Sequence, residues 1–497
     1  MAGRPAVLRR KRTIEDWNAE DVAAWEAGGK RVARRNLIWS IGAEHIGFSI
    51  WSIWSVLVLM MPQPIYHIDA VGKFYLVAMP TLVGALMRIP YTVATARFGG
   101  RNWTVFSALL LLVPTLLTMY YMANPASYTT YLVVAAAAGV GGGNFSSSMT
   151  NINAFYPQRL KGWALGLNAG GGNIGVPAVQ LLGLAIIAVL GRTYSGDGRQ
   201  AAVLCSIYLA LIVIAALGAF LFMDNLRDQK ADLSAMARML KHRESWVMSV
   251  LYIGTFGSFI GYSFAFGQIL NINFTAELTE AAQALQGSER VAALRAVAGD
   301  ASLRAAQIAF LGPLLGSLVR PLGGRLADRF GGGRITLYTF LTMALAASVV
   351  VATGLHNGHR APTHAELWWY VVGFILLFVL SGIGNGSTYK MIPSIFEAKS
   401  KSVAGDAAAW SRNMSGALIG FAGALGAFGG VLINMVLRAS YAATKSATNA
   451  FVVFLAFYAV CAVITWAVFL RRPSGVALDV IETIRPAATS ATQPVRA

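Results

Sequence analysis

Two arginines, Arg88 and Arg320, lie inside long apolar stretches of this 497-residue sequence. Each precedes another arginine, Arg97 or Arg329, by nine residues, and that second arginine stands where the apolar stretch ends. At about 1.5 Å of helical rise per residue, nine residues cover close to half of a ~30 Å hydrocarbon core. Both guanidinium groups are therefore predicted at mid-membrane depth, where a charged side chain costs at least about 2.5 kcal/mol.

A guanidinium at that depth needs a partner, and its chemistry indicates which kind. The group is a planar fork that stays charged and donates parallel hydrogen bonds to oxyanions. A structural ion pair is the simpler interpretation, but no Asp or Glu stands near the middle of any apolar stretch. We therefore expect the two arginines to bind a small, flat anion with several oxygens. Without the anion, two buried positive charges would lie uncompensated, which favours obligatory exchange of one anion for another.

The composition is that of an integral membrane protein. Hydrophobic residues make up 56% of the chain and charged residues 12%, so the apolar content far exceeds the needs of one soluble core. The net charge of +18 is spread between apolar runs, which argues against a nucleic-acid-binding domain. Cys205 and Cys461 both fall in apolar stretches, so we expect neither a disulfide nor a metal site, and no cofactor.

Windows of about 20 mostly apolar residues predict an all-α membrane protein with twelve transmembrane helices. The windows run roughly over 37–61, 74–97, 103–123, 130–156, 162–190, 201–223, 246–272, 306–328, 335–355, 367–396, 409–437 and 448–470. Lysine and arginine gather in alternate connections, so the positive-inside rule predicts that both termini are cytoplasmic.

The predicted organisation has two helical halves and three soluble segments. These are a basic leader (1–36), an N-terminal six-helix half (37–223), a cytoplasmic linker (224–245), a C-terminal six-helix half (246–472) with an external helical insert (273–305), and a disordered tail (473–497). The insert is too polar to span a membrane, and the tail is rich in Pro, Thr and Ala. The leader is either an amphipathic helix at the membrane surface or a solvated segment.

The two arginine segments are copies of one another. "GALMRIPYTVATARFGG" (84–100) and "GSLVRPLGGRLADRFGG" (316–332) share seven residues in register without a gap. Glycines repeat in the same way: Gly139, Gly141 and Gly143 match Gly382, Gly384 and Gly386, and Gly166, Gly172 and Gly175 match Gly420, Gly426 and Gly429. A six-plus-six repeat predicts a binding site between the halves near the midplane of the membrane.

Four further side chains are predicted at the depth of the arginines: Phe145, Asn173, Tyr252 and Phe256. Tyr252 stands one helical turn before Phe256 and shares its face. For a single Phe in a membrane helix, and for most of the repeated glycines, helix packing is the ordinary role. Several such residues at one depth, on different helices, favour a binding site.

Glu44 and His45 form the only acid–histidine pair inside a predicted span. Proton-coupled transport needs a group of this kind, because its charge must change during the cycle. The pair follows Arg35 by roughly nine residues, so it is predicted nearer the cytoplasmic face than the two central arginines. Two roles stay open: a structural one, in which Glu44 is hydrogen-bonded or paired, and proton coupling.

The motifs "GGGNFSSSMTNINAFYP", "GLNAGGGNIGV", "LYIGTFGSFIGYS", "GALMRIPY" and "GALIGFAGALGAFGG" together resemble the NarK-like nitrate/nitrite porters of the major facilitator superfamily. The resemblance covers all twelve spans and implies the fold of that superfamily. It implies that Arg88 and Arg320 clamp the anion, that Phe145 and Phe256 cover its planar faces, and that Asn173 and Tyr252 donate hydrogen bonds. The repeated glycines of spans five and eleven would let those helices bend and slide.

The sequence departs from the family pattern in a few places. The superfamily's loop motif has Asp328 in its second copy, but Ala96 stands at that position in the first copy. Lys390 replaces a neutral polar residue near the inner end of span ten, and Ala422 stands where some relatives have serine. These departures bear on substrate preference and gating more than on the fold.

We therefore expect a monomeric multi-pass transporter in the lipid bilayer of the cell membrane, exchanging nitrate and nitrite by alternating access. A proton-coupled nitrate symporter and a carrier of another small anion are the alternatives of the same fold. A proton-driven sugar or drug carrier would show carboxylates at mid-depth, and an enzyme would show a nucleophile, metal cluster or phosphate loop; the sequence shows neither pattern. A sensor that does not transport would leave the two arginines unexplained.

Overall fold

Long apolar helices dominate the computed structural model, which describes residues 12–190, 198–227, 237–358, 362–403 and 407–471. Eleven helices in this part of the chain are long and apolar enough to cross a membrane. The predicted fourth span is also helical, as α8 (Tyr128–Ala138), η3 (Gly139–Gly143) and α9 (Asn144–Phe155) in succession. This span is rich in Gly, Ser and Asn, which lower its hydropathy. The prediction of an all-α membrane protein is confirmed.

The chain divides into two compact units, each described here by itself. Unit 1 comprises Met1–Ala231 with Ser263–Leu314, and unit 2 comprises Asp232–Tyr262 with Leu315–Ala497. The predicted tail (473–497), part of the predicted linker (228–236) and the first residues of the leader (1–11) lie outside the described residues.

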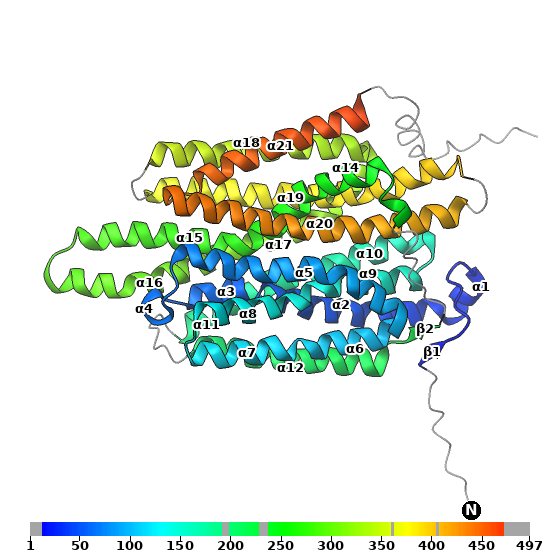
Figure 1. The fold of residues 1–497 in the computed structure, drawn as a ribbon, viewed down its shortest axis with the longest axis horizontal. Coiled ribbons are helices and arrows are strands. Elements are labelled where there is room, and N and C mark those ends of the chain that lie inside the picture. Colours follow the sequence, from blue (N-terminus) through cyan, green and yellow to red (C-terminus); the bar gives the residue numbers. More distant parts are fainter. Residues whose placement is uncertain (1–11, 191–197, 228–236, 359–361, 404–406, 472–497) are drawn as a thin grey trace, which may run out of the picture. The chain divides into compact units, whose positions relative to one another are not determined.

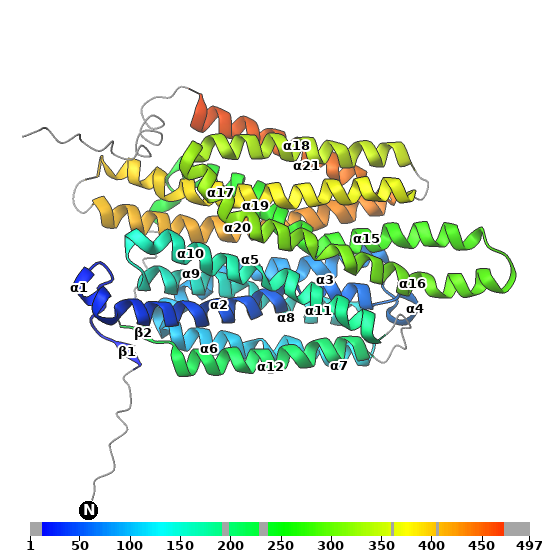
Figure 2. The same ribbon diagram turned by 180° about the vertical axis from the view of Figure 1, so that it is seen from behind.

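Unit 1 contains the first six predicted spans and a helical hairpin. Its other elements are β1 (Thr13–Ile14), α1 (Val22–Ala24), η1 (Trp25–Gly29), α2 (Lys30–Ser52), α3 (Trp54–Leu57), η2 (Val58–Met60), α4 (Gln63–Tyr66), α5 (Ala70–Phe98), α6 (Gly100–Leu110), α7 (Leu112–Ala123), α10 (Gln158–Asn173), α11 (Gly175–Leu190), α12 (Arg199–Phe222), β2 (Asn225–Leu226) and α16 (Gly287–Ala309). Helices α6 and α7 pack along α12, as both ribbon views show (Figure 1, Figure 2).

Unit 2 contains the later spans. Its elements are α14 (Arg243–Tyr252), η4 (Ile253–Gly257), α17 (Leu311–Phe330), α18 (Gly332–Asn357), α19 (His364–Ser400), α20 (Ala407–Thr444), α21 (Thr448–Thr465) and η5 (Trp466–Leu470). Helix α15 (Ser258–Gln283) begins in unit 2 and continues into unit 1, whereas α17 begins in unit 1 and continues into unit 2 after Leu314. A capping box starts α19: Thr363 accepts from the Glu366 backbone N–H, and the Glu366 carboxylate accepts from the Thr363 N–H at 2.7 Å.

The two arginine helices end in the same way, as the sequence repeat predicts. Gly99 closes α5 with φ of 87°, and Gly331 follows α17 with φ of 91°. Only glycine adopts such dihedrals without strain, because it lacks a Cβ atom. Each glycine N–H still donates to a carbonyl four residues earlier, Gly99 to Thr95 and Gly331 to Ala327.

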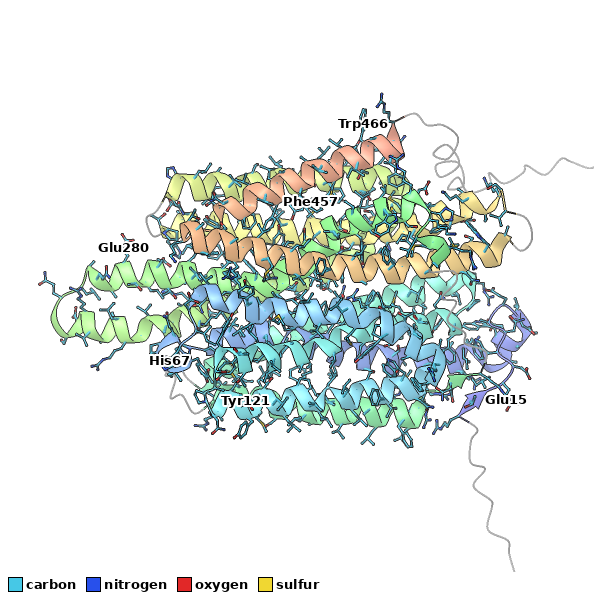
Figure 3. The ribbon with its side chains drawn as sticks, in the orientation of Figure 1. Glu15, His67, Tyr121, Glu280, Phe457 and Trp466 are labelled. Atoms are coloured by element: carbon cyan, nitrogen blue, oxygen red, sulfur yellow. The ribbon has the colours of Figure 1, made fainter. Side chains whose placement is uncertain are left out.

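The α15–α16 hairpin occupies most of the predicted insert. In Figure 1 its tip reaches beyond the ends of the other helices of unit 1. Figure 3 labels Glu280 on this hairpin, and His67 and Tyr121 at the same end of unit 1, which we call the hairpin end. Glu15 lies at the opposite end, which we call the leader end.

The leader packs onto the protein at the leader end. Strand β1 pairs in parallel with β2, so Thr13 lies opposite Asn225. Trp25 is 4% exposed and packs edge-on against Tyr156, with ring centroids 5.6 Å apart. This cluster is completed by Ala33, Leu37, Ile152, Phe155, Ala164 and Leu226.

An ion pair also holds the leader end. The buried carboxylate of Asp224, directly before β2, pairs with Arg35 of α2. The leader therefore holds the first residues after α12.

We predict that Trp25→Ala destabilises unit 1 by about 3–5 kcal/mol, the usual effect of removing a buried aromatic side chain. Each unit carries one buried free cysteine, Cys205 in unit 1 and Cys461 in unit 2. The measurement uses Cys461→Ser protein, so that a thiol-reactive fluorophore can label only Cys205, and labelling is followed as the temperature rises. Cys205 should react at a lower temperature in the Trp25→Ala variant than in protein that keeps Trp25.

The matched control is Trp163→Ala, because Trp163 lies in the same unit and is 61% exposed. Equal shifts in the two variants would contradict a structural role for the packed leader.

Candidate functional site

Arg88 of α5 is buried among aromatic rings in unit 1. Its side chain is 1% exposed, and its guanidinium carbon lies 4.5 Å from the centre of the Phe145 ring and 5.7 Å from that of Trp51. An aromatic face carries partial negative charge, so these contacts stabilise a cation away from water. Phe48 packs edge-on against both rings, at 6.1 Å from Phe145 and 5.2 Å from Trp51. The predicted association of Arg88 with Phe145 thus has a specific geometry.

Trp51 is a site residue that the sequence analysis missed. Its Nε1–H donates to the Pro80 carbonyl at 2.7 Å, which fixes the ring between α2 and α5. Glycines make the room: a Cβ on Gly84 would overlap the indole, and one on Gly142 would lie 2.9 Å from its Cε2 atom. The sequence did carry a signal for this role, since Trp51 lies inside a predicted span. A buried indole N–H requires a hydrogen-bond acceptor, which gives such a tryptophan a fixed position.

Asn173 is the last residue of α10 and is 1% exposed. Neither of its amide atoms forms a hydrogen bond with any residue that the structure describes. Leaving a buried polar group unsatisfied costs about 1–3 kcal/mol, so this amide suits a ligand or water that it can contact. The structure does not join Asn173 to Arg88 by a hydrogen bond.

Arg320 of α17 is 7% exposed and lies in a second aromatic site in unit 2. Its Nη2–H donates to the Tyr252 hydroxyl at 3.1 Å, and its guanidinium carbon lies 5.8 Å from the centre of the Phe256 ring. Tyr252 and Phe256 stack, with centroids 5.1 Å apart and planes 9° apart. Tyr389, which the sequence analysis did not identify, has its ring centre 5.5 Å from the guanidinium.

Two donors in the unit 2 site are available to a ligand. Nη1 of Arg320 is buried and has no hydrogen-bond partner among the described residues. The Tyr252 hydroxyl accepts from Arg320, so its own proton remains free to donate. Phe256 lies in η4, a π-helical turn, an element that is frequent at functional sites. This combination fits a small oxyanion whose face lies along the rings.

The structure thus assembles the predicted residues in two groups. Arg88 and Phe145 belong to unit 1, and Arg320, Tyr252 and Phe256 belong to unit 2. Of the residues described, none forms a group of three or more His, Cys, Asp or Glu side chains that could hold a metal ion.

Glu44 ties three helices of unit 1 together. It is fully buried on α2, and its Oε2 atom accepts from Ser148 of α9 and from Asn168 Nδ2 of α10, the latter at 2.6 Å. His45 Nδ1 lies 3.2 Å from the Gly171 carbonyl. Since α9 begins at Asn144, the tie also positions the segment that carries Phe145.

The six glycines predicted to gate fall into two kinds. A Cβ on Gly172 would overlap Glu44, and one on Gly426 would lie 2.7 Å from Tyr252 Cδ1. A Cβ on Gly175 would overlap the His45 carbonyl oxygen, and a Cβ on Gly429 would lie 2.9 Å from Ile253 Cγ2. Gly166 and Gly420 have nothing within 4 Å of such an atom. Packing therefore requires glycine at four of these positions and leaves two without a steric explanation.

One departure from the family pattern, Lys390, meets a residue of the loop motif in unit 2. Lys390 Nζ lies 2.9 Å from Asp328 Oδ1, so the lysine of span ten pairs with the aspartate of the loop motif. Both side chains are about half exposed, and such a pair contributes at most about 1 kcal/mol. Ala96 offers no carboxylate at the matching position of unit 1.

Comparisons with known proteins agree with this fold. A family model described as Major Facilitator Superfamily matches residues 46–432. Among solved structures, a D-xylose-proton symporter aligns with a TM-score of 0.59 at 12% identity, covering 87% of this chain and 96% of that one. A bacterial homologue of the lysosomal transporter Spinster aligns with a TM-score of 0.56 at 16% identity, covering 88% and 98%. The protein is thus a membrane transporter, not an enzyme.

Similar sequences indicate the family within this superfamily to which the chain belongs. The nitrate/nitrite transporter NarU of Salmonella typhimurium is 33% identical over 92% of this chain and 96% of its own length. The probable nitrate/nitrite antiporter NarK2 of Thermus thermophilus is 31% identical over 92% and 97%. The chain therefore belongs to the nitrate/nitrite transporter family of the Major Facilitator Superfamily.

We predict that Gly172→Ala and Gly426→Ala lower stability by about 1–3 kcal/mol, because the added methyl group overpacks a close contact. Gly166→Ala and Gly420→Ala, one on each of the same helices, should leave stability equal or slightly raised, since alanine is the better helix former. Thermal labelling of Cys205 reports the pair in unit 1, and labelling of Cys461 reports the pair in unit 2. Equal destabilisation within a pair would contradict the packing difference.

Proposed function

We propose that this protein carries nitrate and nitrite across the membrane by alternating access, exchanging one anion for the other. One observation carries the proposal: each unit holds a buried arginine against an aromatic ring, Arg88 with Phe145 and Arg320 with Phe256. The names of its relatives, among them a nitrate/nitrite transporter and a probable nitrate/nitrite antiporter, support the same substrates.

The two arginines would bind the anion together, one from each half of the repeat. Nitrate and nitrite are flat and carry their charge on oxygens, so guanidinium N–H groups can bind their edges while Phe145 and Phe256 cover their faces. The unbonded amide of Asn173 and the hydroxyl proton of Tyr252 are suited to donate the remaining hydrogen bonds. Trp51 and Tyr389 would help to keep the guanidinium groups in place.

Exchange follows from the electrostatics of an empty site. A buried cation is unfavourable where water is excluded and no counter-ion is bound. Rearrangement of the empty protein would therefore be unfavourable, whereas a bound anion of either kind would lower this cost. The repeated glycines of spans five and eleven, including the unencumbered Gly166 and Gly420, would allow those helices to move in this cycle.

Proton symport is the alternative, and Glu44 is the residue on which it would depend. Both Ser148 and Asn168 donate to this carboxylate, which supports a fixed charge and a structural role. We accordingly assign Glu44 to helix positioning, with His45 alongside it.

In the cell membrane, we propose a monomer surrounded by lipid, with both termini and the leader in the cytoplasm. The basic residues around the leader, among them Arg31, Arg34 and Arg35, support this orientation under the positive-inside rule. The hairpin end, with α15 and α16, would then face outward.

We predict that Arg88→Ala and Arg320→Ala each reduce nitrate uptake into reconstituted vesicles by about 100-fold or more, because hydrogen bonds to a charged partner are lost. Arg88→Lys and Arg320→Lys should also fail, since an ammonium keeps the charge but not the planar fork. Arg290→Ala on the exposed hairpin is the control and should transport normally. Normal uptake by a folded Arg88 or Arg320 variant would refute the clamp.

We also predict that nitrate enters vesicles only when nitrite or nitrate is loaded inside, and that an imposed pH gradient does not change the rate. Because Glu44 is assigned a structural role, any Glu44→Gln protein that remains folded should show the same requirement for internal anion. The measurement is isotopic or electrode-detected counterflow. Proton-driven uptake into vesicles free of internal anion would replace exchange with symport.

A further inference from the structure

Lys73 is a buried cation that the proposed anion clamp does not use. It lies in the first turn of α5 at the hairpin end of unit 1, and its side chain is 8% exposed. Burying an ammonium group is unfavourable unless it is paired and hydrogen-bonded. The structure shows no hydrogen bond and no ion pair between Lys73 and any residue that it describes. Its burial therefore needs an explanation other than a structural salt bridge.

Asp69 does not supply that explanation. Its carboxylate caps α5 by accepting the Gly72 N–H at 2.7 Å, and it is exposed to solvent. Its negative charge acts on Lys73 from beyond ion-pair distance. Asp69 therefore offsets part of the charge on Lys73 but forms no ion pair with it.

A second polar group with unmet bonding capacity lies close by. Gln268 of α15 is 2% exposed, and its Nε2–H donates weakly to the Ala70 carbonyl at 3.4 Å, three residues before Lys73. Its Oε1 atom has no hydrogen-bond partner among the described residues. Gln268 thus contacts the same first turn of α5 that carries Lys73, and the unmet bonding capacity of the two side chains suits water or a small ion.

Polar and aromatic contacts join α15 and α16 to the other helices of unit 1. Gln180 of α11 donates to the Ser263 carbonyl at 2.9 Å, and Ser302 of α16 donates to the Leu59 carbonyl at 2.9 Å. Trp51, which contacts Arg88, also packs edge-on against Phe264 of α15, with centroids 5.4 Å apart.

Lys73 shares a face of α5 with Arg88. The steps from Lys73 to Thr81 and from Thr81 to Arg88 are eight and seven residues, each about two helical turns. All three side chains are buried, and the two cations are separated by about 22 Å along the helix axis. A single helix face therefore carries one cation at the hairpin end and another in the aromatic site.

We propose that Lys73 is a second anion-binding residue, which receives a monovalent oxyanion at the hairpin end before the anion reaches Arg88. This inference rests on the proposed function and adds to it a recruiting site on one side of the membrane only. A positive group at a pore mouth raises the local anion concentration and the association rate. The arriving anion also supplies the partner that Lys73 lacks when it is buried.

The test compares nitrate KM from the two faces of oriented vesicles for wild type, Lys73→Gln, Lys73→Met and Lys73→Arg. A single cysteine at Ser288 on the hairpin, in protein lacking Cys205 and Cys461, identifies the hairpin face with an impermeant thiol reagent. We expect both neutral variants to raise KM from the hairpin face by about tenfold. We expect kcat, and KM from the leader face, to stay within twofold, and Lys73→Arg to restore the wild-type value.

Arg295→Gln is the matched control, because it removes one positive charge from an exposed position on the same hairpin. It should leave KM at the wild-type value. The proposal is overturned if Lys73→Gln leaves KM unchanged, if Arg295→Gln raises it equally, or if KM rises equally from both faces. It is also overturned if both neutral variants fail to fold while Lys73→Arg folds, since the charge would then be structural. Absence of nitrate transport in wild type would instead refute the proposed function.

Discussion

The structure depends on keeping a guanidinium group stable away from water. Both buried arginines meet this requirement with aromatic faces: Phe145 and Trp51 around Arg88, Phe256 and Tyr389 around Arg320. Such contacts compensate part of the lost hydration, and Nη1 of Arg320 still has no hydrogen-bond partner among the described residues. Aromatic faces therefore suit a buried cation whose N–H groups are proposed to bind an oxyanion.

The glycine-rich helices follow from the same requirement. A large ring can pack directly against a helix backbone only where the backbone residues lack side chains. Gly84 and Gly142 leave this space for the Trp51 ring. The matching helices of unit 2 behave alike, since a Cβ on Gly382 would overlap the Gly316 carbonyl. The two halves therefore share close packing at glycine, but the side chains around the arginines differ. The Tyr252 hydroxyl contacts Arg320 in unit 2, and the Trp51 indole contacts Arg88 in unit 1.

Polar ties away from the arginines hold this arrangement in unit 1. Glu44 joins α2 to α9 and α10, and Asp224 joins the segment after α12 to Arg35. Each is a buried carboxylate that accepts from more than one donor, which is the condition for retaining a charge in a low-dielectric interior. The packed leader adds an apolar counterpart through Trp25. These contacts fix unit 1 at its leader end.

Much of this molecule could be predicted from its sequence, for identifiable reasons. The long apolar windows require helices in a membrane, and the repeat around Arg88 and Arg320 requires two similar halves, because both signals are local and survive without knowledge of packing. The family resemblance linked Phe145, Tyr252 and Phe256 to the arginines. Only the tertiary structure revealed Trp51 and Tyr389, the tie at Glu44, the packed leader and the unpaired Lys73. Those features depend on which helix faces meet, and hydropathy and spacing along one chain do not record which side chains from different helices come into contact.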